Sequence, residues 1–171
     1  MSGDGIEGRN AMGMTCYYFR TDEDAIWKIR EGNMDFIYEE NKENLLDIDK
    51  SWHAIHFTLT GCAYGGEEGD ILSNLVFGGE PINEKDMGCG PARLFTKEKT
   101  AQLSEALKKW DKTAFCKNFN VADMLEHDIY PVMSGEDDAD FFTYVWTCFD
   151  ALKEFFQKAA EERQSVLTFI S

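Results

Sequence analysis

One segment near the carboxyl end constrains the fold more than any other. Residues 136–163 are predicted to form a single long helix, because acidic residues open it and Arg163 lies in its last turn, as the helix dipole favours. Its first half contains DFFTYVWTCF, which is apolar on nearly every face, and its second half is amphipathic, with Phe155, Phe156 and Ala159 on one side. A helix that is apolar all round must be covered by other elements, so we expect it to lie in the middle of the molecule.

The two ends of the chain supply the expected partner layer. MTCYYF at residues 14–19 and SVLTFI at residues 165–170 both have the composition of short apolar strands, and a further strand is predicted at residues 92–95. Shorter helices are predicted after Thr21 as an N-cap, over residues 46–61 and 71–77, from residue 97 to 110, over 112–118 and after Asn120. Because first and last strands of this kind can pair in the middle of one sheet, we predict an α+β fold. Its small, mainly antiparallel sheet packs against several helices.

At 171 residues the chain has the length of one domain. Residues 1–11 are Gly-rich and polar and contain Ile6-Glu7-Gly8-Arg9, which matches a protease site commonly engineered into expressed proteins. We therefore interpret residues 1–11 as an expression-tag remnant and residues 12–171 as a single α+β domain.

Charge and cysteine content restrict the partners and the compartment. The net charge of −15 repels phosphate backbones, so nucleic-acid binding is not expected, whereas a basic partner protein would be attracted. No apolar run is long enough for a membrane span, and no signal peptide is evident. The five cysteines are odd in number, widely spaced and without a CxxC pair, which indicates a reducing compartment and a cytoplasmic location.

The segment LDIDKSWHAIHFTLTG, residues 46–61, holds two of the three histidines. Read as a helix ending at Gly61, it places two stripes side by side at helical spacing. The apolar stripe, which must face the core, consists of Ile48, Trp52, Ile55 and Leu59. The polar stripe beside it consists of Asp49, His53, His56 and Thr60, and His56 lies closest to the apolar stripe, so it should be the more buried histidine.

The polar stripe allows two interpretations. In the first it is a site, where Asp47 or Asp49 orients His56 as a general base, or where Asp49, His53 and His56 ligate a metal such as zinc. The HAIH pair lacks the internal glutamate of the HExxH zinc motif, which weakens the metal hypothesis. In the second interpretation, Asp49 is a helix N-cap and His56 is a semi-buried histidine satisfied by hydrogen bonds.

A second irregular region, GGEPINEKDMGCGPARLF at residues 78–95, contains neither GxxxxGK[ST] nor GxGxxG. Arg93 is its best candidate for holding an anion such as a carboxylate, with a purely structural pairing as the alternative. Cys89 between two glycines is a candidate nucleophile only if a histidine partner is present. Tyr130, before Pro131 at a helix-to-loop break, is a candidate buried phenol.

Several of these motifs together resemble the YfbM-like family, a bacterial family of unknown function. The resemblance rests on MGM at residues 12–14, LDIDKxW…HFxLTG at 46–61, IYP at 129–131 and LTFI at 167–170, and it covers residues 12–171. The matching positions of the most specific segment include Asp47, Asp49, Lys50, Trp52, His56 and Gly61, whereas His53 lies outside the pattern. The resemblance implies a compact α+β cytosolic protein and carries no established activity, cofactor or catalytic residue.

The sequence thus leads to two hypotheses. The first is a non-enzymatic binding protein, such as an inhibitor or immunity-type partner of a basic protein. The second is a small-ligand binder or an enzyme, with Asp47, Asp49 and His56 as candidate catalytic groups and Lys50, Arg93 and Tyr130 as candidate ligand-binding groups. No cofactor is predicted, and the sequence carries no signal for the oligomeric state.

Overall fold

The computed structural model of the protein describes residues 13–40, 42–132, 135 and 137–171. Its strands are β1 (Cys16–Thr21), β2 (Leu45–Asp47), β3 (Glu80–Asp86), β4 (Pro91–Phe95) and β5 (Ser165–Ile170). Its α-helices are α2 (Glu23–Arg30), α3 (Trp52–Thr60), α4 (Asn74–Phe77), α5 (Lys97–Leu107), α6 (Lys112–Asn118), α7 (Val121–Glu126) and α8 (Asp138–Glu161). Short π- or 3-10 turns are η1 (Phe36–Glu40), η2 (Lys42–Asn44), η3 (Asp49–Ser51) and η4 (Ile71–Ser73). The predicted tag remnant, residues 1–11, lies outside the described residues.

The five strands form one antiparallel sheet in the order β2-β1-β5-β4-β3. The last strand is therefore central, and it pairs with the first along its whole length, from Cys16 opposite Ile170 to Thr21 opposite Ser165. The predicted pairing of the two terminal strands is confirmed, as is the α+β class. Pairing across the whole chain closes the fold, because every helix from α2 to α8 lies between these two strands in sequence.

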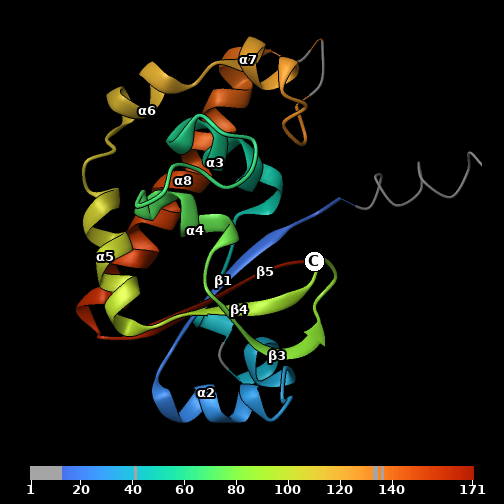
Figure 1. Ribbon diagram of the computed structural model, residues 1–171, viewed down its shortest axis with the longest axis vertical. Helices are drawn as coiled ribbons and strands as arrows, with labels where there is room; N and C mark the ends of the chain where they lie inside the picture. The colour runs from blue at the N-terminus through green and yellow to red at the C-terminus, as the bar shows by residue number, and fades with distance from the viewer. Residues whose placement is uncertain (1–12, 41, 133–134, 136) are drawn as a thin grey trace, which may run out of the picture.

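Helices cover both faces of the sheet unequally (Figure 1). Because side chains alternate along a strand, Tyr18 and Val166 point into a large core beneath α3 to α8, while Phe19 and Leu167 point into a smaller core under α2 and η1. The helices that carry the candidate residues thus stand on one face only. The opposite face is closed by a separate and thinner layer.

The long helix α8 begins and ends two residues inside the predicted range. Asp137 caps it by accepting a hydrogen bond from the Asp140 N–H, which satisfies one of the free donors of the first turn. The expectation that its first half, apolar on nearly every face, lies in the middle of the molecule needs correction. Thr143 and Thr147 are exposed, and the fully buried positions form one stripe at helical spacing that begins with Phe141, Val145 and Phe149. The reason is that α8 packs across one side of the sheet and leaves its outer face to solvent.

Strand boundaries depart from expectation where polar residues take part. Residue Thr21 closes β1 instead of capping the next helix, and the Asp22 carboxylate accepts the capping bond from Ala25 N–H. The glycines and prolines of residues 79–91 predict an irregular segment where the structure has strand β3. It forms a strand nonetheless, since it lies at the sheet edge and pairs with β4 through backbone groups.

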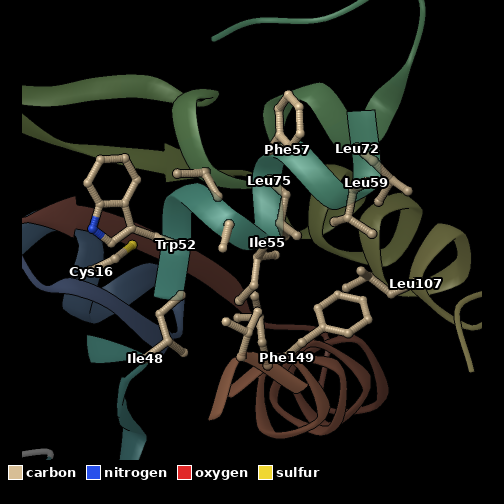
Figure 2. Close-up of a cluster of buried hydrophobic side chains, with 14 of the residues drawn as sticks. Cys16, Ile48, Trp52, Ile55, Phe57, Leu59, Leu72, Leu75, Leu107 and Phe149 are labelled. Carbon is tan, nitrogen blue, oxygen red and sulfur yellow. The ribbon is translucent and has the colours of Figure 1, made fainter. Parts of the chain in front are cut away.

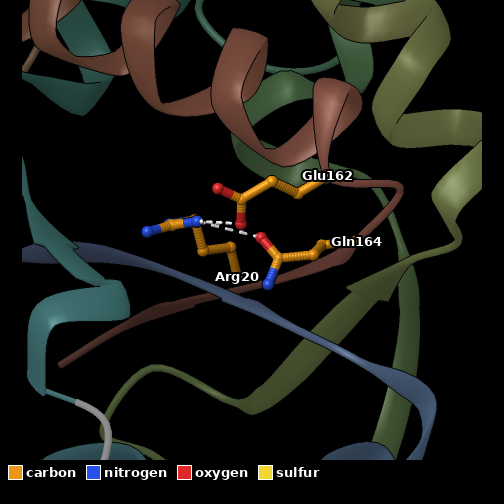
Figure 3. Close-up of polar contacts among 3 residues, drawn as sticks. All are labelled: Arg20, Glu162 and Gln164. Atoms are coloured by element: carbon orange, nitrogen blue, oxygen red, sulfur yellow. Dashed lines mark hydrogen bonds and ion pairs between the residues drawn. The ribbon is translucent and has the colours of Figure 1, made fainter.

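A polar contact joins the end of α8 to the sheet (Figure 3). The Arg20 Nη1 atom donates to Glu162 Oε2 at 2.8 Å and to Gln164 Oε1 at 3.0 Å. The Arg20 side chain is buried while that of Glu162 is half-exposed, so the pair is only partly screened by solvent. This contact fixes the turn between α8 and β5. Within the described residues, no helix is both long and apolar enough to cross a membrane.

Candidate functional site

Helix α3 carries only the second part of the segment predicted as a helix over residues 46–61, because residues 46 and 47 pair with β1 as part of β2 and residues 49–51 form η3. The expected apolar stripe of Ile48, Trp52, Ile55 and Leu59 is buried, and Figure 2 shows these side chains among Phe149 of α8, Leu107 of α5 and Leu75 of α4. Gly61 ends the helix in the left-handed conformation, with φ of 72°, and its N–H donates to the Phe57 carbonyl. The predicted core face and C-terminal glycine are confirmed.

The two histidines of the polar stripe are buried as well. Helical spacing predicted that they share a face, but it did not predict that this face is covered. The exposed fractions are 1% for His53 and 0% for His56, because the loop after Gly61, η4 and α4 cover the side of α3 that faces away from α8. The prediction that His56 would be the more buried histidine is correct, but the difference is negligible. The polar stripe of α3 therefore faces the segment that covers it, which consists of the loop after Gly61, η4 and α4.

The His53 imidazole holds two loops. Its Nδ1 atom accepts a hydrogen bond from Tyr130 N–H at 3.0 Å, so Nε2 carries the proton and donates to the Ala63 carbonyl at 2.7 Å. The ring also stacks on Trp52 with centroids 5.0 Å apart. Burial lowers the pKa of His53, which favours this neutral form, and the Ala63 carbonyl opposes the shift. Both ring nitrogens are engaged within the protein.

The His56 imidazole has no such partners. Among the described residues, neither of its ring nitrogens has a partner in hydrogen-bond geometry, although the ring is fully buried. It meets the Phe77 ring edge-on, with centroids 4.7 Å apart. Burial lowers the pKa of His56 to about 4, and the Gly65 backbone and the Asp70 carboxylate oppose this effect. The ring is therefore neutral near pH 7 and keeps an unused acceptor nitrogen. The expectation that hydrogen bonds satisfy His56 is met only weakly, because its interaction with the Gly65 backbone lies outside hydrogen-bond geometry.

Asp49 does not cap the helix as expected. Its φ is 51°, and its backbone N–H donates to Asp47 Oδ1 at 2.7 Å. Its own carboxylate accepts a hydrogen bond from the Tyr144 hydroxyl at 2.7 Å, and the same hydroxyl accepts one from Lys50 N–H at 3.1 Å. Desolvation and then the Asp49 hydrogen bond raise the pKa of Tyr144. Asp47 and Asp49 thus attach η3 to α8 and do not orient His56.

Lys50 and Tyr130 lie against the amino-terminal end of the described chain. The Tyr130 hydroxyl accepts a hydrogen bond from Met14 N–H at 2.9 Å, and Trp52 Nε1 donates to the Met14 carbonyl at 2.7 Å. The Lys50 side chain lies so close to Gly13 that a Cβ added there would be 2.3 Å from Lys50 Cε. These side chains contact residues 13 and 14 and so position the chain before β1.

Arg93 and Cys89 have backbone partners in other elements. Arg93 on β4 donates from Nη1 to the Phe77 carbonyl, so its contact is with the backbone that leads out of α4. Cys89 is exposed, and its N–H donates to the Ile170 carbonyl. Within the described residues, no group of three or more His, Cys, Asp or Glu side chains is placed to hold a metal ion. The metal hypothesis for Asp49, His53 and His56 is therefore corrected, because these side chains act separately.

A hollow that sequence reasoning missed lies beside the covering loop. It encloses about 640 Å³, and its lining includes Gly65, Glu67, Glu68, Asp70, Phe77 and Lys99. Tyr64, next to this lining, is 70% exposed and lies 5.6 Å from Phe77 between ring centroids. The available signal was the run YGGEEGD, in which one aromatic precedes three glycines and three acids. It reads as an ordinary loop until the fold places it over His56.

Comparison with known proteins supports the resemblance found in the sequence. The curated Protein YfbM of Escherichia coli (strain K12) is 26% identical over 167 residues, which cover 93% of this chain and 99% of that protein. The crystal structure of YfbM, described as a protein of unknown function from Escherichia coli, matches with a TM-score of 0.71 at 25% identity. This match covers 92% of the present chain and 99% of the other.

The relatives carry no stated activity, so they identify the fold and the family and leave the chemistry open. Residues 12–169 match the family described as Domain of unknown function (DUF1877). This range takes in all five strands except the last residue of β5, both histidines of α3 and the acidic hollow. The chain is therefore a member of the DUF1877 family, to which its motifs had pointed.

Proposed function

We propose that this protein is a non-enzymatic binding protein that holds a basic partner, and that the partner docks at the hollow beside α4. The observation that carries the proposal is the charge of that hollow. Glu67, Glu68 and Asp70 line it, and Lys99 is the one cation among the residues that line it within the described chain. With a net charge of −15, the protein as a whole attracts a cationic surface and directs it toward such a concave acidic region.

The competing enzymatic proposal loses support from the same geometry. The Asp49 carboxylate is engaged by Tyr144, and the carboxylate that acts on His56 is that of Asp70. Arg93 is engaged with a backbone carbonyl. The two members of an acid–base pair must lie within hydrogen-bond reach of each other. Asp49 instead binds Tyr144, and His56 packs against Phe77.

Compartment and domain organisation complete the proposal. All five cysteines are free, with Cys16 buried and Cys89 and Cys116 exposed. Exposed free thiols suit a reducing environment, so we place the protein in the cytoplasm. We also propose that residues 12–171 act as one domain.

A salt-dependent binding assay tests the docking site. The probe is a short peptide of alternating arginine and glycine, titrated calorimetrically at about 20 mM and about 300 mM salt. The Glu67→Gln/Glu68→Gln variant is expected to bind roughly two- to tenfold more weakly than the parent at low salt, because two exposed charge contacts are lost.

The matched control is Glu84→Gln/Glu154→Gln, which removes the same charge from exposed positions on β3 and α8. It should retain most of the affinity. An equal loss in both variants would mean that the peptide responds to overall charge alone and would overturn the proposed docking site. Absence of any binding at low salt would contradict the basic-partner function itself.

A further inference from the structure

The buried, unpartnered imidazole behind the hollow suggests which chemical group the hollow accepts. A buried polar atom without a hydrogen bond is costly and rare in folded proteins, so it calls for a physical explanation. Neither ring nitrogen of His56 has a partner in hydrogen-bond geometry within the described chain. The Gly65 backbone interacts with the ring from outside that geometry, so the acceptor nitrogen is the one left unused. Its immediate surroundings are the Phe77 ring, the Gly65 backbone and the Asp70 carboxylate, and all three residues also line the hollow.

Gly65 lies beside His56 and also lines the hollow. Gly65 has no side chain and takes a left-handed φ of 64°, and Gly66 and Gly69 follow it in the same loop. A ligand group that displaces this loop slightly would meet a neutral imidazole acceptor. The same group would remain next to the carboxylates of Glu67, Glu68 and Asp70.

The aromatic residues at this place narrow the class of ligand further. Tyr64 presents a largely exposed ring that lies 5.0 Å from His53 and 5.6 Å from Phe77, between centroids. A planar cation stacks on such a ring, and a guanidinium does so better than an ammonium. A guanidinium also carries five N–H donors in a fixed plane, which can reach separate acceptors at once.

We propose that the hollow is a receptor for an arginine side chain of the basic partner, stacked on Tyr64 and donating to the acidic loop and to His56. This inference rests on the proposed function and adds the identity of the group that is recognised. Lys99 also lines the hollow, and its positive charge repels a guanidinium. The three carboxylates outweigh it.

The experiment compares three small probes that differ only in side-chain chemistry. N-acetyl-arginine amide, N-acetyl-lysine amide and N-acetyl-citrulline amide are titrated into the whole protein at pH 7. NMR records the ring nitrogens of His56 and the ring protons of Tyr64. The arginine probe should shift both sets of signals saturably, the lysine probe should bind roughly two- to fivefold more weakly, and the uncharged citrulline probe should not saturate.

Variants separate stacking from general attraction. Tyr64→Leu changes an exposed ring and is expected to weaken the arginine probe roughly two- to fivefold. Tyr38→Leu removes another partly exposed tyrosine as a control. The Tyr38 ring centroid lies 6.2 Å from that of Phe169, on the opposite face of the sheet, so this variant should leave the affinity unchanged.

The inference is overturned if the arginine probe leaves His56 and Tyr64 unshifted, if citrulline binds as well as arginine, or if both tyrosine variants lose affinity equally. If the arginine-rich peptide still binds through Glu67 and Glu68 in that case, the proposed function stands and only the arginine receptor fails. If the peptide does not bind at all, the basic-partner function has failed as well.

Discussion

Acid should destabilise this protein through His56 in a way that one substitution can isolate. The ring is fully buried without a hydrogen-bond partner among the described residues, and burial lowers its pKa from 6.5 to about 4. Between these two values the unfolded chain binds a proton that the folded chain does not. The free energy of unfolding is therefore highest above pH 6.5 and falls as the pH falls toward 4, below which the loss is complete.

The size of this effect follows from the two proton affinities. Each tenfold difference in proton affinity corresponds to about 1.4 kcal/mol, so His56 removes about 3 kcal/mol once both states are protonated. At pH 5 the loss is roughly 2 kcal/mol, a large fraction of the typical stability of about 5–15 kcal/mol. Leucine at position 56 cannot titrate and has no polar atom to leave unpaired.

The assay is urea unfolding followed by circular dichroism at pH 7.5, 6.5, 5.5 and 5, for the parent and for His56→Leu. The parent should lose roughly 2 kcal/mol more than the variant between pH 7.5 and 5. Carboxylates and His53, whose pKa is also lowered by burial, remain in both proteins, so their contributions largely cancel. His127→Gln removes an exposed histidine as a control and should keep the parent's pH dependence. Parallel curves for the parent and His56→Leu would refute the reasoning.

Three further substitutions test the surroundings of α3. Tyr144→Phe removes the hydroxyl that donates to Asp49, and we expect a loss of about 1 kcal/mol in chemical unfolding; an unchanged midpoint would show that water replaces the bond at no cost. Gly61→Ala has open space for its Cβ but a φ of 72°, so thermal unfolding should report a loss of about 1 kcal/mol from backbone strain alone. Phe149→Ala empties a fully buried position of α8, and the free energy of unfolding should fall by about 3–5 kcal/mol, with a loss below 1 kcal/mol contradicting its place in the core.

The elements that sequence patterns predicted are those whose signal is local. Helix α5 begins after Thr96, whose hydroxyl accepts from Lys99 N–H, and α7 begins after Asn120, which caps it in the same way. Strand β5 occupies the predicted residues 165–170. In each case a few neighbouring residues contain the whole physical cause, either a capping side chain or an apolar run.

Long-range pairing decided the elements that sequence patterns missed. Strand β3 is polar and becomes a strand only because β4 offers it backbone partners at the sheet edge. Asp49 had the residue type and position of an N-cap, yet the Tyr144 hydroxyl, 95 residues away in the chain, engages its carboxylate. No window of local sequence contains that hydroxyl.

In the candidate site, too, local spacing predicted some features and tertiary packing decided the others. Helical spacing alone predicted that Ile48, Trp52, Ile55 and Leu59 are buried together, and all four are buried, although α3 begins only at Trp52. It also brought attention to His53 and His56. Which of the two is satisfied depends on where the glycine-rich loop after α3 and the distant Tyr130 backbone fold. Burial and hydrogen-bond partners belong to the packed chain, since they arise from contacts between segments that only tertiary structure brings together.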